Sequence, residues 1–149
     1  MQLHLDGSNT IAAPREKVFS MLTDPHFLAT TIPDAEDVNV VDADTIEARL
    51  KLRVAIVSST MKTRMTIAAR EPPSKATLLA EGSGSGSILK VTSVFTLEGG
   101  DPTRMAWSAE ADITGVMAGL GSTLLKGFAT KKVAEIFEGI TKAIETASK

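Results

Sequence analysis

The C-terminal part of the chain carries apolar side chains at steps of mostly three and four between Met117 and Ala147. This spacing is typical of an amphipathic helix, which at 1.5 Å per residue would be about 45 Å long. The apolar positions are Met117, Leu120, Leu124, Phe128, Val133, Ile136, Phe137, Ile140 and Ile144. Because charged side chains such as Glu138 and Lys142 occupy the opposite face, we predict that the apolar stripe covers a broad surface inside the fold.

Three glycines lie within this predicted helix, at Gly121, Gly127 and Gly139. Each costs about 1 kcal/mol relative to alanine in a helix interior, so we expect a local reason for their presence. Close packing on a sheet is one such reason. The other is that the missing side chains leave room for a ligand, or let the first turns bend away and open a cavity.

The N-terminal part of the chain predicts a strand followed by two short helices. Residues 3–11 alternate between apolar and polar side chains, as a strand with one inward face does. Pro14 suits the first turn of a helix, and Asp24 and Pro25 suit the N-cap and the first position of a second helix. We expect this second helix to run to Ile32 and to end at Pro33.

A period of two then continues for about 80 residues, which is typical of antiparallel strands with one solvent-facing side. Turn residues separate strands at 71–74 and 99–102, whereas the Gly-Ser repeat from Gly82 to Ser87 predicts a strand bend or bulge. Strands segregated from helices indicate an α+β protein. We therefore predict a curved antiparallel sheet of about seven strands, wrapped around the long C-terminal helix, with two short helices after the first strand.

A sheet curved around one helix tends to leave a cavity, and several inward positions of the predicted strands carry small or polar side chains. These positions are Asn9, Ala48, Thr63, Ala69, Ser93, Ala109 and Ala111. A smaller, fully packed core is the alternative. Adaptable methionine side chains and flat aromatic ones suit the lining of a tunnel for a lipophile. The predicted lining is Phe19, Phe27, Met61, Met65, Trp107, Met117, Leu120, Leu124 and Phe128.

The mouth of such a cavity is expected between residues 27–32 and residues 116–124. The second of these segments is apolar and rich in glycine, so it would form a mobile rim suited to contact with a membrane surface.

Composition narrows the possible functions. The net charge is −2 and no basic run is present, which argues against a nucleic-acid partner. The lack of cysteine excludes thiolate metal sites and cysteine nucleophiles and permits an intracellular location. His4 falls on a polar strand face and His26 in the first turn of a helix, so we expect no metal, no cofactor and no catalytic histidine. We also expect no signal peptide and no membrane-spanning segment.

Several short segments carry a family resemblance in their order and spacing. They are residues 11–19 (IAAPREKVF), residues 22–25 (LTDP) running to Ile32-Pro33, residues 81–84 (EGSG), and residues 119–122 (GLGS) leading to Lys131-Lys132. Together they resemble the family of the carbon monoxide dehydrogenase G subunit, within the START-like/SRPBCC helix-grip superfamily. The resemblance implies one START-like/SRPBCC domain over residues 1–149. Two positions depart from the family pattern, which commonly has Trp in place of Phe19 and Gly in place of Asp34.

The resemblance implies non-catalytic binding of a hydrophobic small molecule, a quinone or other isoprenoid lipid. The protein would serve a carbon monoxide dehydrogenase type molybdenum enzyme as a carrier or membrane-recruitment factor. This favours a cytoplasmic location, with or without peripheral contact to the inner face of the cell membrane. Some relatives attach to membranes through a C-terminal tail; this chain ends at Lys149, so we expect any membrane contact to use the domain itself.

Two alternatives remain open at the level of sequence. Some helix-grip proteins are cyclases, aromatases or hydrolases, and an enzyme of this kind would need polar groups that converge inside the cavity. The candidates are Asn9, Thr63, Glu81 and Ser93. The other alternative is an assembly factor that has no ligand and docks on an enzyme subunit through an exposed apolar patch.

Overall fold

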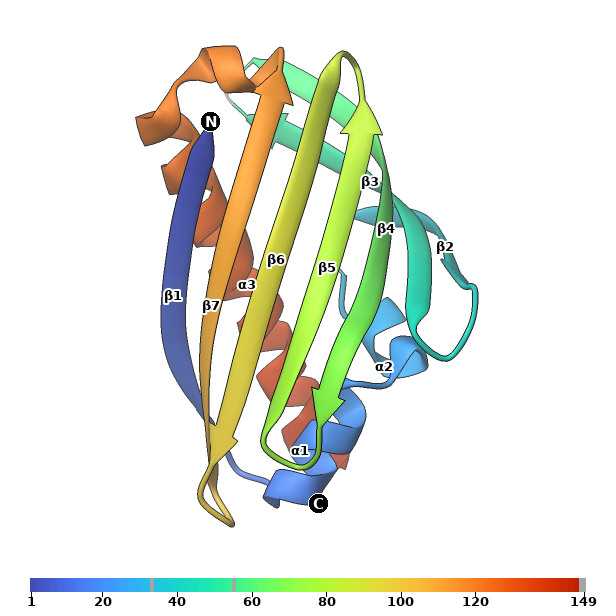
Figure 1. Ribbon diagram of the computed structural model, residues 1–149, viewed down its shortest axis with the longest axis vertical. Coiled ribbons are helices and arrows are strands. Elements are labelled where there is room, and N and C mark those ends of the chain that lie inside the picture. The colour runs from blue at the N-terminus through green and yellow to red at the C-terminus, as the bar shows by residue number, and fades with distance from the viewer. Residues whose placement is uncertain (33, 55, 148–149) are drawn as a thin grey trace.

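The computed structural model describes residues 1–32, 34–54 and 56–147. In chain order the elements are β1 (Gln2–Ile11), α1 (Arg15–Leu22), α2 (Pro25–Ala29), β2 (Ala35–Val40), β3 (Thr45–Val54), β4 (Val57–Glu71), β5 (Lys75–Gly84), β6 (Ser87–Glu98), β7 (Thr103–Gly115), the short 3-10 helix η1 (Met117–Leu120) and α3 (Ser122–Ala147). Figure 1 shows this arrangement. The predicted α+β class, with two short helices after the first strand and one long C-terminal helix, is confirmed.

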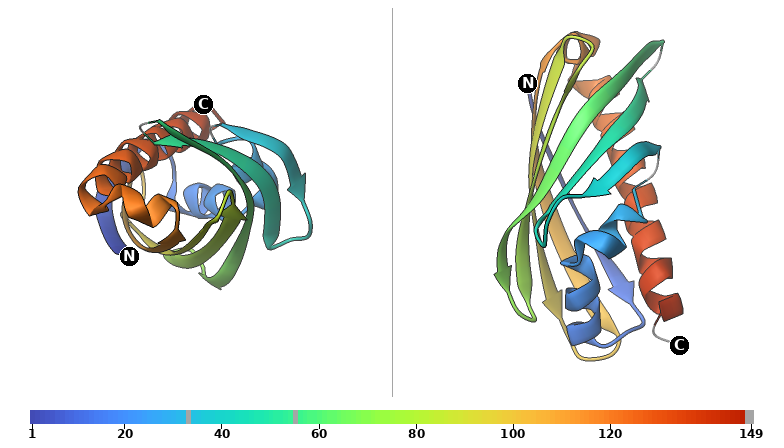
Figure 2. Two further views of the ribbon diagram at one scale, coloured as in Figure 1. Left: turned by 90° about the horizontal axis from the view of Figure 1, so that it is seen from above. Right: turned by 90° about the vertical axis from the view of Figure 1, so that its right-hand side faces the viewer.

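The seven strands form one antiparallel sheet in the order β1-β7-β6-β5-β4-β3-β2. Seen from above, the sheet curls around an interior and α3 lies across its open side (Figure 2). The helices α1 and α2 lie within the curl at the lower end of Figure 1. Apolar side chains on the inner face of the strands therefore pack against α1 and α2 below and against α3 along the length of the sheet.

The predicted C-terminal helix is interrupted near its start. Gly121 has a φ of 92°, a left-handed value that residues with a side chain rarely adopt, and it separates η1 from α3. The continuous helix is about 39 Å long at 1.5 Å per residue. Within α3 the apolar stripe runs through Leu125, which is buried like Ile140 and Ile144, whereas Leu124, which the spacing placed inside, is 42% exposed.

The lower half of the molecule holds a packed core. Its buried members are Ile11, Ala13, Val18, Phe19, Leu22, Ala76, Phe95, Leu97, Met105, Ile140 and Ile144. Trp107 stacks on Phe137 of α3, with ring centroids 4.8 Å apart and planes 20° from parallel. The Glu145 carboxylate also accepts a hydrogen bond from the Ala12 backbone N–H at 2.8 Å. The C-terminal half of α3 is thus fixed to the sheet by packing and by polar contacts.

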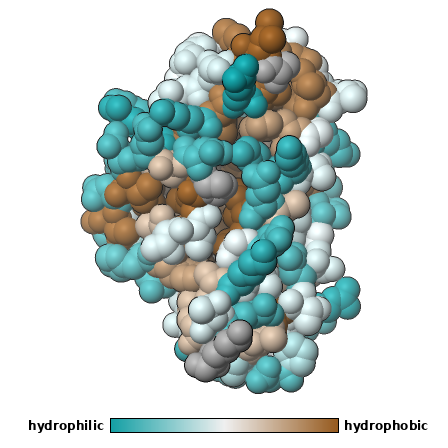
Figure 3. Space-filling model, turned by 180° about the vertical axis from the view of Figure 1, so that it is seen from behind, coloured by the Kyte–Doolittle hydropathy of each residue, from teal (hydrophilic) through white to brown (hydrophobic). Residues whose placement is uncertain are grey.

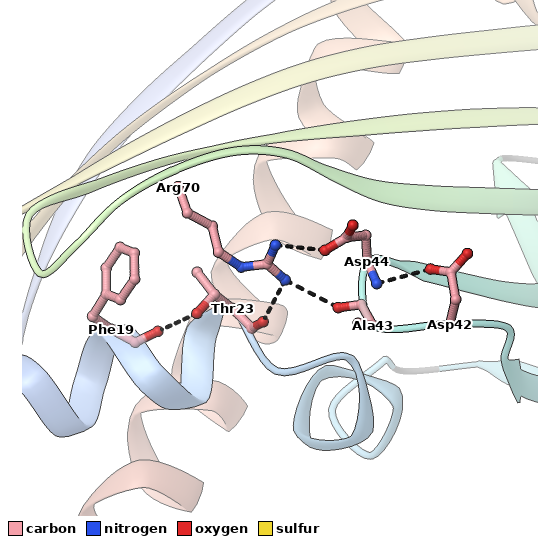
Figure 4. Close-up of polar contacts among 6 residues, drawn as sticks. All are labelled: Phe19, Thr23, Asp42, Ala43, Asp44 and Arg70. Carbon is pink, nitrogen blue, oxygen red and sulfur yellow. Dashed lines mark hydrogen bonds and ion pairs between the residues drawn. The ribbon is translucent and has the colours of Figure 1, made fainter.

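A bulge in β4 changes which side chains face inward. The pairing with β5 shifts between Ile67 and Ala69, so Ala69, predicted inside, is exposed. Arg70, predicted on the outer face, instead donates hydrogen bonds to the Thr23 carbonyl at 3.2 Å and to the Ala43 carbonyl at 3.0 Å, and pairs with Asp44 at 2.5 Å (Figure 4). One arginine therefore joins β4, the end of α1 and the β2–β3 turn.

Two other local predictions change in detail. The second helix has the predicted Asp24 cap, whose side chain accepts from the His26 N–H at 2.9 Å, but it ends at Ala29 rather than Ile32. The predicted stop at Pro33 lies outside the described residues. The Gly-Ser repeat is a hairpin instead of a bend or bulge, since Ser85 and Gly86 have φ values of 50° and 77° and turn the chain directly from β5 into β6.

The glycines of α3 are not required by close packing. A Cβ atom added to Gly139 would meet no atom within 4 Å, whereas one added to Gly84 would come 2.2 Å from the Thr60 carbonyl oxygen. We expect Gly139→Ala to raise the free energy of unfolding by about 1 kcal/mol through helix propensity. Gly84→Ala should lower it by about 1–3 kcal/mol through steric overlap. Urea unfolding of both variants measures this difference, and equal effects would contradict the packing described for β4 and β5.

Candidate ligand-binding cleft

The edge of β3 is only partly covered by another strand. β2 pairs with β3 from Val40 opposite Ile46 to Ala35 opposite Leu50, and the Lys51 N–H donates to the Asp34 carbonyl at 3.1 Å. Beyond Lys51, no strand among the described residues continues along this edge. The first turns of α3 lie across from it and leave a cleft, which we call the β3–α3 cleft.

One end of the β3–α3 cleft is an open apolar groove of ≈ 820 Å³. Its walls are Arg53 and Val54 of β3, Leu120 and Gly121 at the helix break, and Ser122, Thr123, Leu124, Gly127, Phe128 and Lys131 of α3. Gly127 therefore lies beside open space, consistent with the predicted use of a glycine to leave room at this face of the helix.

The other end is a polar cavity of ≈ 460 Å³. It is lined by Asp34, Lys51, Leu52, Arg53, Ser58, Ser59, Thr60, Ser85 and Lys132. Arg53 lines both cavities, and Lys131 and Lys132 are neighbours on α3. The cleft thus changes along its length from apolar, beside η1, to polar, beside Asp34.

Lys132 closes the polar end toward β2. Its ammonium group lies 2.6 Å from the Asp34 carboxylate, 3.5 Å from Glu135, and 5.9 Å from the ring centroid of Phe128. The hydrogen bond to Asp34 raises the pKa of Lys132 above its ordinary value, so this side chain is positively charged at neutral pH.

The remaining basic residues of the cleft differ in their partners. Lys51 pairs with Glu36 at 2.8 Å, which raises the pKa of Lys51. Arg53 and Lys131 form no ion pair within the part of the chain that the structure describes. The cleft therefore has an excess of positive charge in a protein whose net charge is −2.

Three exposed apolar side chains lie on the groove wall or on segments that adjoin it in the chain. Ile56, next to the β3–β4 turn, is 93% exposed, Val116 before η1 is 57% exposed, and Leu124 is partly exposed on α3. We call these three residues the apolar tip. Figure 3 shows hydrophobic surface gathered at this upper end of the molecule, with hydrophilic side chains beside it. The groove consequently opens where the protein offers apolar surface to its surroundings.

The nine residues predicted to line a ligand site are not brought into one cavity. Leu120, Leu124 and Phe128 line the groove. Met61 and Met117 lie beneath it in a cluster with Leu125.

The other four predicted residues lie further from the groove. Phe19 and Trp107 belong to the lower core, and Phe27 and Met65 pack with the cluster of Leu28, Ile46 and Ile67. A ligand-binding role for the nine residues remains a prediction.

One of the two segments expected at the mouth lies at the cleft and the other does not. The start of α3 forms one wall, but the facing wall is β3, and residues 27–32 are not part of either cavity. Sequence reasoning missed Arg53, Ser59 and Lys132 because charged and hydroxyl side chains at strand or helix positions are usually solvated surface. The run of hydroxyl residues from Ser58 to Thr60 and the paired lysines were the available signals.

The polar residues proposed for catalysis do not converge. Glu81 is exposed on the outer face of the sheet, where Arg64 and Lys90 are its neighbours in register. Asn9, Thr63 and Ser93 lie on β1, β4 and β6, and an intervening strand separates each from the next. Within the described residues, no group of three His, Cys, Asp or Glu side chains is arranged to hold a metal ion.

Comparison with known families decides the family of this sequence. The model of the CoxG family, named for the G subunit of carbon monoxide dehydrogenase, matches residues 7–145. The chain belongs to the CoxG family. The family resemblance of the short motifs is therefore confirmed, and a search of curated proteins gave no match to this CoxG chain.

Solved structures share the fold of this CoxG protein. A conserved protein from Geobacillus kaustophilus is 24% identical with a TM-score of 0.87, over 99% of this chain and 98% of that one. A START superfamily protein from Mycobacterium smegmatis is 12% identical with a TM-score of 0.70, over 97% and 98%. The aromatase/cyclase Zhui from Streptomyces is 14% identical with a TM-score of 0.67, over 100% and 97%. These similarities place the CoxG chain in the START-like fold.

Among the described residues, no helix has both the length and the apolar character that a membrane span needs.

Leu124 and Leu125 are adjacent in the chain, but Leu124 lines the groove and Leu125 lies in the core. Leu125 is 2% exposed, so Leu125→Ala should lower the free energy of unfolding by about 2–5 kcal/mol. Leu124→Ala, the same substitution one residue earlier, should change it by less than about 0.5 kcal/mol. Chemical denaturation measures both values. A larger loss at Leu124 than at Leu125 would contradict the helix rotation that places Leu124 in the groove.

Proposed function

We propose that this CoxG-family protein binds a hydrophobic small molecule, a quinone or another isoprenoid lipid, in the β3–α3 cleft and catalyses no reaction on it. The observation that supports this most directly is the apolar groove of ≈ 820 Å³ beside the exposed apolar tip. Its volume falls within the roughly 300–1,000 Å³ of typical small-molecule sites. The groove is open to solvent, so a ligand can enter without unfolding of the sheet.

The lining explains how affinity would arise. Leu120, Leu124, Phe128 and Val54 offer apolar contact along the groove, and burial of a chain there contributes about 0.8 kcal/mol per CH2 group. A chain of several isoprene units would therefore bind with little need for polar contacts. The lower core, in which Phe19, Phe95 and Met105 pack together, does not have to open when a ligand binds in the groove.

The family suggests what the bound lipid serves. We propose that residues 1–149 act as one START-like/SRPBCC domain that carries the lipid for a carbon monoxide dehydrogenase type molybdenum enzyme, or recruits that enzyme to a membrane. The support for this partner is the family name alone. The proposed place of action is the cytoplasm, peripheral to the inner face of the cell membrane.

The apolar tip supports contact with a lipid surface. Ile56 and Val116 expose apolar side chains beside the groove, and Arg53 and Lys131 lie nearby as cations suited to anionic lipids. Docking by this end would place the open groove against the bilayer and let a lipid exchange without crossing bulk water.

Lipid capture tests the proposed function. Native mass spectrometry of the protein after mixing with a quinone-containing lipid extract should show a mass increment that matches one lipid. Leu124→Asp places a charge in the apolar groove and should lower the bound fraction about tenfold. Leu79→Asp is a matched control, because Leu79 is similarly exposed (40%) but lies on the outward side of β5. Lack of any lipid on the unsubstituted protein, or equal losses in both variants, would overturn the proposal.

Vesicle binding tests the membrane contact separately. Co-sedimentation with phosphatidylglycerol vesicles should fall about fivefold in Ile56→Glu, because a carboxylate replaces the most exposed apolar side chain of the tip and repels the anionic surface. Leu79→Glu adds the same charge elsewhere and should bind like the unsubstituted protein. Undiminished binding by Ile56→Glu would exclude the apolar tip as the docking end.

A further inference from the structure

The polar end of the cleft contains a buried hydroxyl group with no partner. Ser59 is 6% exposed, and its Oγ atom forms no hydrogen bond with any of the described residues. Buried polar groups in folded proteins nearly always have a partner, because an unpaired one loses its hydration without compensation. Ser59 also lines the polar cavity, so rotation of its hydroxyl toward that cavity would let a bound ligand supply the missing contact.

Positive charge collects around the same cavity. Lys51, Arg53 and Lys132 line it, against the single carboxylate of Asp34. Ser58, Thr60 and Ser85, which carry hydroxyl groups, also line the cavity. Such a set of cations and hydroxyls suits a phosphate or carboxylate group, which accepts several hydrogen bonds at once.

The contact between Lys132 and Asp34 leaves capacity for a further acceptor. The two side chains are 27% and 50% exposed, so their ion pair is partly hydrated and weak. An ammonium group has three N–H donors, and Lys132 can keep one on Asp34 while it turns another toward a ligand.

The polar cavity lies within reach of a molecule held in the apolar groove. Arg53 lines both spaces, and the Lys132 ammonium lies 5.9 Å from the ring centroid of Phe128, which is a wall of the groove. A chain that rests on Phe128 and Leu124 therefore has its end beside Lys132 and Ser59.

We propose that Ser59, Lys132 and Arg53 hold the acidic head group of an amphiphile whose chain occupies the apolar groove. This inference rests on the proposed function and narrows it, because Arg53 has no ion-pair partner among the described residues and a neutral quinone head would leave its charge uncompensated. The ligand class is a single-chain or isoprenoid phosphate or carboxylate.

Isothermal titration with three probes tests the head-group site. Dodecyl phosphate and 1-dodecanol share one chain and differ in charge, and inorganic phosphate has the charge without the chain. Dodecyl phosphate should bind at least about tenfold more tightly than 1-dodecanol, and its advantage should shrink as salt is raised. Inorganic phosphate should not bind in the same concentration range.

Substitutions at Ser59 and Lys132 test whether these residues cause the tighter binding of dodecyl phosphate. Ser59→Ala and Lys132→Met should each reduce the advantage of dodecyl phosphate and leave 1-dodecanol binding unchanged. Lys142→Met is the matched control, because Lys142 also lies on α3 and pairs with a carboxylate, Glu138 at 3.1 Å, but lines neither cavity of the cleft. Ser59→Ala removes an unpaired buried hydroxyl, so the melting temperature of this variant without ligand should not fall. A normal melting temperature would show that weaker binding of dodecyl phosphate is not caused by misfolding.

The outcomes separate the two proposals. Equal binding of dodecyl phosphate and 1-dodecanol, or an advantage that survives Ser59→Ala and Lys132→Met, would overturn the head-group site and leave the lipophile-binding function standing. Tight binding of inorganic phosphate alone would replace the head-group site by one for free anions. Failure of both dodecyl probes to bind would overturn the proposed function and the head-group site with it.

Discussion

A single helix has to cover most of the inner face of a seven-stranded sheet, and this constraint determines where the molecule is solid and where it is open. The C-terminal half of α3 covers its part of the sheet closely, since Ile140 and Ile144 are buried against β1 and α1 and Phe137 stacks on Trp107. The first turns of α3 face a sheet edge that β2 leaves uncovered. Apolar area that the helix cannot cover there becomes the wall of a groove.

The break at Gly121 and the length of β2 act together in making the cleft. The left-handed residue separates η1 from α3, and in the first turn of α3 Leu125 is buried while Leu124 stays partly exposed. β2 covers β3 only as far as Leu50. The end of β3 at Arg53 and Val54 therefore lies across the groove from α3, with no described strand between β3 and α3. Apolar and charged side chains thus meet along one seam, an arrangement suited to molecules that carry both kinds of surface.

Strand alternation, the two short helices and the Asp24 cap could be predicted because each depends on residues close in sequence. The inward direction of Arg70 could not, since the bulge that turns it depends on how β4 pairs with β5. The site was predicted in part for the same reason. Leu120 and Phe128 lie on the face that helical spacing indicates, whereas Ser59 and Lys132 line one cavity only because of how β4 pairs with β3 and where α3 lies.

The uncovered edge of β3 also bears on the behaviour of the protein in concentrated solution. Free strand edges promote pairing between molecules and aggregation, and proteins commonly guard them with charge or with a covering element. Here Lys51 and Arg53 place positive charge along the edge and α3 overhangs it. A narrow ligand can therefore enter a space from which the strand of a neighbouring copy is repelled.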